Sequence, residues 1–369
     1  MATNVPIHSG MTSKKFVEGN DVKLYSVDLT TDDVGGFDGV TSGSEKFIGL
    51  VQSISLQDAR GLPQTGELGS DKTITMIDQT QKSMQMSRLL MKTRSVLRAF
   101  YATVNNDENE GSGDKQGYHP DDIIGGDTIK IYASTELSDD SEETSSSVGG
   151  LFDSENMVGL VQNYSISSNL PISQVGEIGG TKKYLLSSKA SKTINFNRIV
   201  SEDANVLKAF YHNLVGGTPL GGNMWTDLDH PIFNNPITIG IEIYSGNVDP
   251  GFSDPTVVAQ IVLDECLPMN VSGASQQGTR GIADTISFKW HNTKYINGGD
   301  NFLIDLDNPE CREPFNLMVE YTGDDGDAVT SKSVLEGCLV TSINHAISHG
   351  SRSTAETVQV MWESTHNIV

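Results

Sequence analysis

The chain has 369 residues, of which 36% are hydrophobic, and a formal net charge of -23 from 48 acidic and 25 basic residues. This length can form two domains with separate cores, and the 37 scattered glycines exclude a collagen-like repeat. Binding to nucleic acid or to an anionic membrane surface requires clustered Lys and Arg. The chain has no such cluster. We therefore expect no specific nucleic-acid binding and no membrane partner.

No stretch of the sequence approaches 18 consecutive apolar residues, and residues 1–16 lack the apolar core of a signal peptide. We therefore expect the protein to fold in a cytoplasm. The three cysteines, Cys266, Cys311 and Cys338, are too few and too dispersed for a disulfide framework or a zinc cluster. We predict that all three are free, buried thiols.

The first part of the chain contains two long units that share the same motifs. Each motif of the second unit follows its copy in the first unit by the same number of residues as Lys192 follows Lys82. We call this spacing the long offset. A single register kept from position 47 to position 101 is not expected by chance, and it predicts an internal duplication. The motifs that recur are FIGLVQ at 47–52 and MVGLVQ at 157–162, GELG at 66–69 and GEIG at 176–179, Lys82 and Lys192, Arg88 and Arg198, and LRAFY at 97–101 and LKAFY at 207–211.

The last part of the chain contains two shorter units that also match each other. Asp227-Leu228-Asp229 before one proline matches Asp305-Leu306-Asp307 before another. Cys266 matches Cys338, and Trp290 matches Trp362 at the same spacing, which we call the short offset. Each unit, long or short, is expected to contain a strand ending near a tyrosine, a variable loop, and a second strand. These second strands should open at Gly49, Gly159, Glu265 and Gly337.

Alternation with a period of two predicts strands that bury one face, because successive side chains of a strand point to opposite sides. Met84 and Met86 alternate with polar residues in this way, and so do the corresponding Ile194 and Phe196. Each long unit should end in a short amphipathic helix that packs on a sheet, around residues 96–101 and 206–211. The polar segments 105–122 and 134–147 are expected to be exposed loops.

Several motifs with possible chemistry are better explained as structural. His345 and His349 lack the glutamate of a zinc-protease helix, and the acidic run at 107–111 lacks the bidentate glutamate of a calcium loop. The Asp-Leu-Asp pairs at 227 and 305 precede proline and are typical of turns. We therefore predict no catalytic residue, no metal site, no cofactor and no enzymatic activity.

The Gly-Glu-[Leu/Ile]-Gly elements are the most distinctive signature of the long units. Their glycines indicate tight turns, in which Glu67 and Glu177 make either a local hydrogen bond or a contact with a neighbouring subunit. Together with Arg88 and Arg198, these glutamates are our candidates for self-assembly residues.

The order of these motifs resembles that of virion structural proteins of large tailed bacteriophages, a family that we associate with the tail-tube fold. The resemblance covers most of residues 19–369. It implies a mainly β fold, with two tube-type antiparallel β-sandwich or barrel domains and short helices, arising from internal duplication. It also implies subunits that form rings around a DNA-conducting lumen, whose walls we expect to be acidic and therefore repulsive to DNA.

The partners implied are further copies of the chain, as a trimer or hexamer, and tail proteins such as sheath or baseplate. The expected location is the virion tail, assembled in the cytoplasm of a bacterial host. Two alternatives are another virion role, such as head decoration or collar, and a glycan-binding β-protein that stacks sugars on Trp225, Trp290 or Trp362.

The order of two long units followed by two short ones leaves the domain boundaries open. We prefer a nested arrangement, with an outer domain from residues 1–110 plus 299–369 and a second domain from residues 111–298, because crossing connections are rare. The alternatives are an interleaved pairing and an intimate pairing of the two long units.

Overall fold

The computed structural model describes residues 22–31, 37–49, 51–60, 64–66, 73–75, 80–92, 94–101, 123–135, 150–176, 183–200, 206–211, 228–246, 255–274, 283–322 and 329–368. The protein is mainly β, and its strand pairings are antiparallel. The two α-helices among the described residues are short, with α1 at Val96–Phe100 and α2 at Val206–Phe210. The expectation of an antiparallel β protein with short helices is therefore confirmed.

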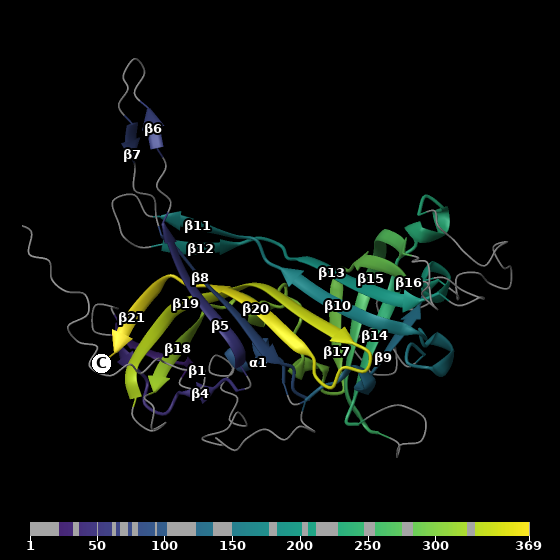
Figure 1. Cartoon of the computed structure of the whole chain (residues 1–369), viewed down its shortest axis with the longest axis horizontal. Coiled ribbons are helices and arrows are strands. Elements are labelled where there is room, and N and C mark those ends of the chain that lie inside the picture. Colours follow the sequence, from purple (N-terminus) through teal and green to yellow (C-terminus); the bar gives the residue numbers. More distant parts are fainter. Residues whose placement is uncertain are drawn as a thin grey trace, which may run out of the picture.

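Eight strands form one continuous hydrogen-bonded sheet that runs along the long axis of the molecule (Figure 1). We call it the central sheet. In spatial order its strands are β5 (Val51–Arg60), β8 (Thr80–Leu89), β20 (Ala355–Met361), β19 (Val329–Ser348), β10 (Val161–Asn169), β13 (Ser191–Ile199), β16 (Ala283–Lys289) and β15 (Val257–Ala274).

A second layer of strands covers one face of the central sheet as two separate groups. The group around the first half of β19 consists of β1 (Val22–Val27), β4 (Lys46–Phe47), β18 (Phe315–Thr322) and β21 (Ser364–Ile368). The group around the first half of β15 consists of β9 (Ile129–Ser134), β14 (Ile237–Tyr244) and β17 (Asn292–Ile296).

Both β15 and β19 belong to the two layers at once, which differs from the prediction. The sequence predicts a new strand opening at Glu265 and at Gly337, but each position lies inside one long strand. Glu265 has φ 52° and Gly337 has φ 66°, so a single left-handed residue redirects each strand from the outer layer into the central sheet. The alternation of side chains does not reveal such a bend.

Each half of the molecule has its own hydrophobic core between the layers. One core contains Met84 and Met86 from β8 and Leu97 from α1. The other contains Phe196 from β13 and Leu207 from α2. Each helix thus buries its apolar face against a sheet, as the sequence predicts. Each core fills the space between the central sheet and one outer group of strands.

The strand pairings of the two halves correspond in register. Ile54 pairs with Met86 as Tyr164 pairs with Phe196, and the β5–β8 and β10–β13 pairings shift register at matching places, after Val51 and Val161. The β14–β15 and β18–β19 pairings also shift at matching positions. The long and short offsets of the sequence therefore identify residues with the same place in the sheet.

Three small hairpins and five single-turn 3₁₀ helices complete the described structure, and one hairpin projects far from the central sheet (Figure 1). The hairpin strands are β2 (Leu29–Thr31) with β3 (Phe37–Val40), the projecting β6 (Gln64–Gly66) with β7 (Thr73–Thr75), and β11 (Ile172–Gly176) with β12 (Lys183–Ser187). The 3₁₀ helices are Gly126–Thr128, Ser154–Asn156, Pro231–Asn234, Gly299–Asn301 and Pro309–Arg312.

Candidate assembly surface

The face of the central sheet that points away from both cores carries short, uncharged polar side chains. Strand alternation places them there, because the residues between them point to the side of the sheet that carries the cores. We call this surface the polar face. Its members on successive strands are Ser53, Ser55, Gln57, Ser83, Gln85, Ser87, Thr357, Gln359, Ser342, Asn344, Ser165, Ser167, Thr193, Asn195, Asn197, Thr285, Ser287, Asn270 and Ser272.

Side-chain hydrogen bonds link neighbouring strands across the polar face. Asn195 Nδ2 donates to Ser165 Oγ at 3.3 Å, and Ser287 Oγ donates to Asn195 Oδ1 at 2.5 Å. Asn197 Nδ2 donates to Thr285 Oγ1 at 3.3 Å. The amides and hydroxyls of β10, β13 and β16 therefore satisfy part of one another's hydrogen-bonding capacity.

The polar face is almost free of charge. Among the residues of the eight strands that are paired in register on this face, Lys289 at the end of β16 is the single charged one. The charged residues of these strands turn to the other side, where Arg88 lies opposite Glu356 and Arg198 lies opposite Asp284. This face therefore lacks the acidic character of the chain as a whole, because Glu356 and Asp284 lie on the opposite side of the sheet.

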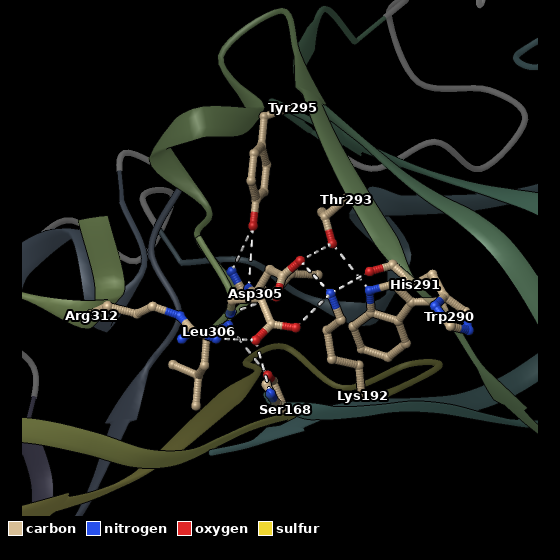
Figure 2. A network of polar contacts seen from close by, with 12 residues as sticks. Ser168, Lys192, Trp290, His291, Thr293, Tyr295, Asp305, Leu306 and Arg312 are labelled. Atoms are coloured by element: carbon tan, nitrogen blue, oxygen red, sulfur yellow. Dashed lines mark hydrogen bonds and ion pairs between the residues drawn. The ribbon is translucent and has the colours of Figure 1, made fainter. Parts of the chain in front are cut away.

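Besides the polar face, the structure has a network of polar contacts at the junction between the two halves. This network is centred on Lys192 (Figure 2). The Lys192 side chain is 3% exposed, and its Nζ lies 2.8 Å from Asp305 Oδ2 and 3.4 Å from Asp307 Oδ2. It also donates a hydrogen bond to the His291 carbonyl. A buried ammonium is costly without partners, and these contacts supply them.

A chain of donors fixes the carboxylate of Asp305. Trp290 Nε1 donates to Thr293 Oγ1 at 3.0 Å, and Thr293 Oγ1 donates to Asp305 Oδ2 at 2.9 Å. The backbone N–H of Asp305 donates to the Tyr295 hydroxyl at 3.3 Å. Figure 2 shows these side chains converging on one point from several segments.

Asp307 accepts a hydrogen bond from the Ala190 N–H at 2.8 Å and one from Arg312 at 2.6 Å. Burial of its carboxyl raises the pKa, but the Ala190 bond, Arg312 and Lys192 outweigh it and hold the pKa of Asp307 below its usual range. Asp307 therefore stays ionised and binds the β12–β13 turn to the segment that follows β17.

That segment connects the two cores. Phe302 and Ile304 are buried in one core, whereas Leu303 and Leu306 are buried in the other. The Leu306 N–H donates to Ser168 Oγ on β10 at 3.2 Å. The network is therefore a structural joint, in which Lys192 of one half contacts the segment that enters the other half.

The four predicted self-assembly residues divide into two groups. Glu67 and Glu177 lie outside the described residues. Arg88 and Arg198 are buried, and Arg198 donates to the carbonyls of Gly159 at 2.8 Å and Ile199 at 3.2 Å. Burial lowers the pKa of Arg198, while nearby Asp284 opposes that effect. A role of these four residues in assembly stays a prediction.

The other residues singled out from sequence are mostly buried. All three cysteines are free and buried, as predicted. Trp290 and Trp362 are buried, so neither offers a ring face to a sugar, and Trp225 lies outside the described residues, as does the acidic run at 107–111. His345 is buried and its Nε2 lies 2.9 Å from Glu356 Oε1.

Within the described residues, no group of three or more His, Cys, Asp or Glu side chains is placed to hold a metal ion. In the same part of the chain, no helix is long and apolar enough to cross a membrane.

No protein-family model and no curated protein matches the chain. Among solved structures, a chain of the anti-feeding prophage (AFP) baseplate aligns with 51% of this chain and 99% of its own, at 10% identity and TM-score 0.28. A chain of the AFP tube-terminating cap aligns with 50% of this chain and 95% of its own, at 9% identity and TM-score 0.30. The Hcp protein aligns with 57% of this chain and 95% of its own, at 11% identity and TM-score 0.19. At these values the similarity carries no conclusion about function.

Proposed function

We propose that this chain is a structural subunit of a bacteriophage tail, in a tail tube or a tube-like hub ring, and that copies of it surround a DNA-conducting lumen. The observation that carries the proposal is the polar face on a continuous eight-stranded sheet. One side of this sheet is covered by both cores, so the other side is available to line a channel.

The chemistry of the polar face suits a channel for DNA. Proteins hold DNA mainly by neutralising phosphates with Lys and Arg, which releases condensed counterions. Hydroxyl and amide side chains give no such gain, and they keep a layer of water at the wall. A wall of this kind neither binds the passing polyanion nor repels it strongly. This replaces the acidic wall that the net charge led us to expect.

We also propose that the chain is a nested duplication, with residues 1–110 plus 299–369 in one domain and residues 111–298 in the other. In support, β1 pairs with β18 and β8 with β20, whereas β9 pairs with β14 and β13 with β16. An interleaved arrangement would instead place β1 beside β14. Each domain would then contribute four strands to the central sheet.

The partners in this proposal are further copies of the chain, as a trimer or a hexamer, and other tail proteins such as sheath or baseplate. The role is structural, without catalysis. The location is the virion tail, after assembly in the cytoplasm of the bacterial host.

Negative-stain electron microscopy of the purified full-length protein tests the function. We expect rings or tubes with an open lumen a few nanometres wide. The protein should be imaged at concentrations at which other virion components assemble. Compact monomers, or closed particles without a lumen, would contradict a tube or hub role. Such particles would favour the head-decoration or collar alternative.

A further inference from the structure

Two strands of the central sheet are paired on one side only, in the part of the chain that the structure describes. β5 pairs with β8, and residues 267–274 of β15 pair with β16. An unpaired strand edge exposes a row of backbone N–H and C=O groups that another strand can pair with. The two free edges lie at opposite ends of the sheet.

The protein already contains the contact that these edges lack. At the centre of the sheet, β10 of one half pairs with β19 of the other half, from Asn163–Ser348 to Asn169–Ser342. β10 matches β5 at the long offset, and β19 matches β15 at the short offset. Each free edge is therefore the counterpart of an edge that is paired within the chain.

Burial differs between the two copies where this neighbour is missing. Ile166 on β10 is 4% exposed, but its counterpart Leu56 on β5 is 40% exposed. Leu339 on β19 is 7% exposed, but its counterpart Leu267 on β15 is 37% exposed. Counterparts inside each half, such as Met86 and Phe196, are both fully buried. The extra exposure is therefore found along the two free edges.

The polar joint at the β10–β19 contact also has a counterpart. Lys192 matches Lys82, which is partly exposed, and Asp307 matches Asp229, which is exposed. Ser168, whose hydroxyl accepts a hydrogen bond from the Leu306 N–H, matches Asp58. Within one chain, Lys192 of one half pairs with Asp307 of the other. The same contact for Lys82 requires an Asp229 from another molecule.

We propose that β5 of one copy pairs antiparallel with residues 267–274 of β15 in a second copy, repeating the β10–β19 contact. Ser167 pairs with Asn344 within the chain, and transferring this pair to the matching positions on the free edges places Gln57 opposite Ser272. Lys82 then forms an ion pair with Asp229 of the neighbour. Leu56 becomes buried, and the polar face continues from one copy to the next.

This contact is heterologous, since each copy uses a different edge at its two ends, and such contacts close into a ring when the rotation between copies allows it. Every half of every copy would then have the same neighbours. The inference rests on the proposed ring-forming function and specifies how the ring is joined.

Paired cysteines test the register. The variant Gln57→Cys/Ser272→Cys, treated with a mild oxidant or a short thiol cross-linker, is expected to give covalent multimers of the full chain. The control Ser53→Cys/Ser272→Cys moves the cysteine about 13 Å along β5 and is expected to stay uncross-linked. The three native cysteines are buried and do not interfere. Equal cross-linking of both variants, or cross-linking of the control alone, would overturn the proposed pairing.

Charge reversal tests the ion pair. Lys82→Glu is expected to abolish assembly while the dissociated chain stays folded, and the double variant Lys82→Glu/Asp229→Lys is expected to restore it. No loss on Lys82→Glu, or no recovery in the double variant, would contradict the ion pair. Rings without Gln57–Ser272 cross-links would reject this edge pairing and leave the proposed function standing. The absence of any ring or tube would reject both.

Discussion

Leu56 and Ile166 occupy the same position in two matching strands, yet Leu56 is 40% exposed and Ile166 is 4% exposed. Both residues face the side of the central sheet that carries the cores. The difference arises because β10 has β19 as a second neighbour and β5 has none among the described strands. The pair therefore separates what a residue contributes to folding from what it contributes to assembly.

Substitution of these two residues should have different effects. Ile166→Ala should lower the free energy of unfolding by about 2–5 kcal/mol, because it leaves a cavity in a packed core. Leu56→Ala should cost the dissociated chain less than about 1 kcal/mol but should weaken assembly. Urea unfolding of the dissociated chain and sedimentation measure the two effects. Similar losses of unfolding free energy for both variants would contradict this account.

Removal of Lys192 should destabilise the chain strongly. Lys192→Ala leaves Asp305 and Asp307 without their ammonium partner, and breaking a buried ion pair costs about 3–5 kcal/mol. The exposed Lys289 serves as a matched control, and Lys289→Ala should change the free energy of unfolding by no more than about 0.5 kcal/mol. Denaturant unfolding measures the free energy of unfolding of both variants. Equal values for Lys192→Ala and Lys289→Ala would show that the joint does not hold the two halves together.

Asp307 should make stability depend on pH in the acid range. Its pKa is lowered in the folded protein, so its ionised form stabilises the fold above the usual pKa of an aspartate. That contribution is lost as the pH falls through the lowered value. Asp307→Asn should therefore flatten the acid side of the stability profile, whereas Asp300→Asn at an exposed position should not. Thermal unfolding from pH 7 to pH 3 measures this, and identical slopes in all three proteins would contradict it.

Glu265→Gly should stabilise the protein. Glu265 adopts φ 52° at a place where the matching strand has Gly337, and glycine enters this left-handed region without the steric cost of a side chain. We expect a gain of about 1 kcal/mol. The reverse change, Gly337→Ala, should be destabilising, because its Cβ would lie 2.9 Å from Glu363 Cγ. Chemical denaturation of both variants measures this, and a loss on Glu265→Gly would contradict it.

The cysteines should be unreactive in the folded protein. Burial raises the pKa of Cys311 to about 12, and it raises those of Cys266 and Cys338 as well. A thiol reagent should therefore label none of the three at pH 8 in native buffer and all three in denaturant, since the thiolate is the reactive form. Rapid labelling of the native chain would show that the cores open readily.

Much of the fold follows from local sequence patterns. The alternation around Met84 and Ile194 predicts core-facing strands, because the period of a strand is visible within a few residues. The constant offsets predict matching registers, because two copies of one sequence pattern fold in the same way. The bend at Glu265 could not be predicted, because no local pattern distinguishes a strand that changes layer from one that ends. The pairing of Lys192 with Asp305 joins two distant parts of the chain and depends on how the halves meet.

Part of the candidate assembly surface has a signal in the sequence. Lys192 and the Asp305-Leu306-Asp307 motif are the two sides of the joint, and Lys82 and the motif at 227–229 are their counterparts in the sequence. The motif at 305 also forms a turn, as predicted, with the Asn308 N–H donating to the Asp305 carbonyl at 3.1 Å. Overall composition does not predict the polar face, since it does not tell which side of a sheet carries the charges. The net charge of -23 predicts an acidic wall, whereas Glu356 and Asp284 lie on the side of the central sheet opposite the polar face.

A cryo-electron microscopy reconstruction of the assembled protein tests the central claim most directly, because it shows which surface faces the lumen. We predict a ring in which the central sheets of neighbouring copies join into one continuous barrel. Ser165, Asn195 and Ser287 would point into the channel. An assembly in which the polar face is turned outward, or is covered by another subunit, would contradict this account.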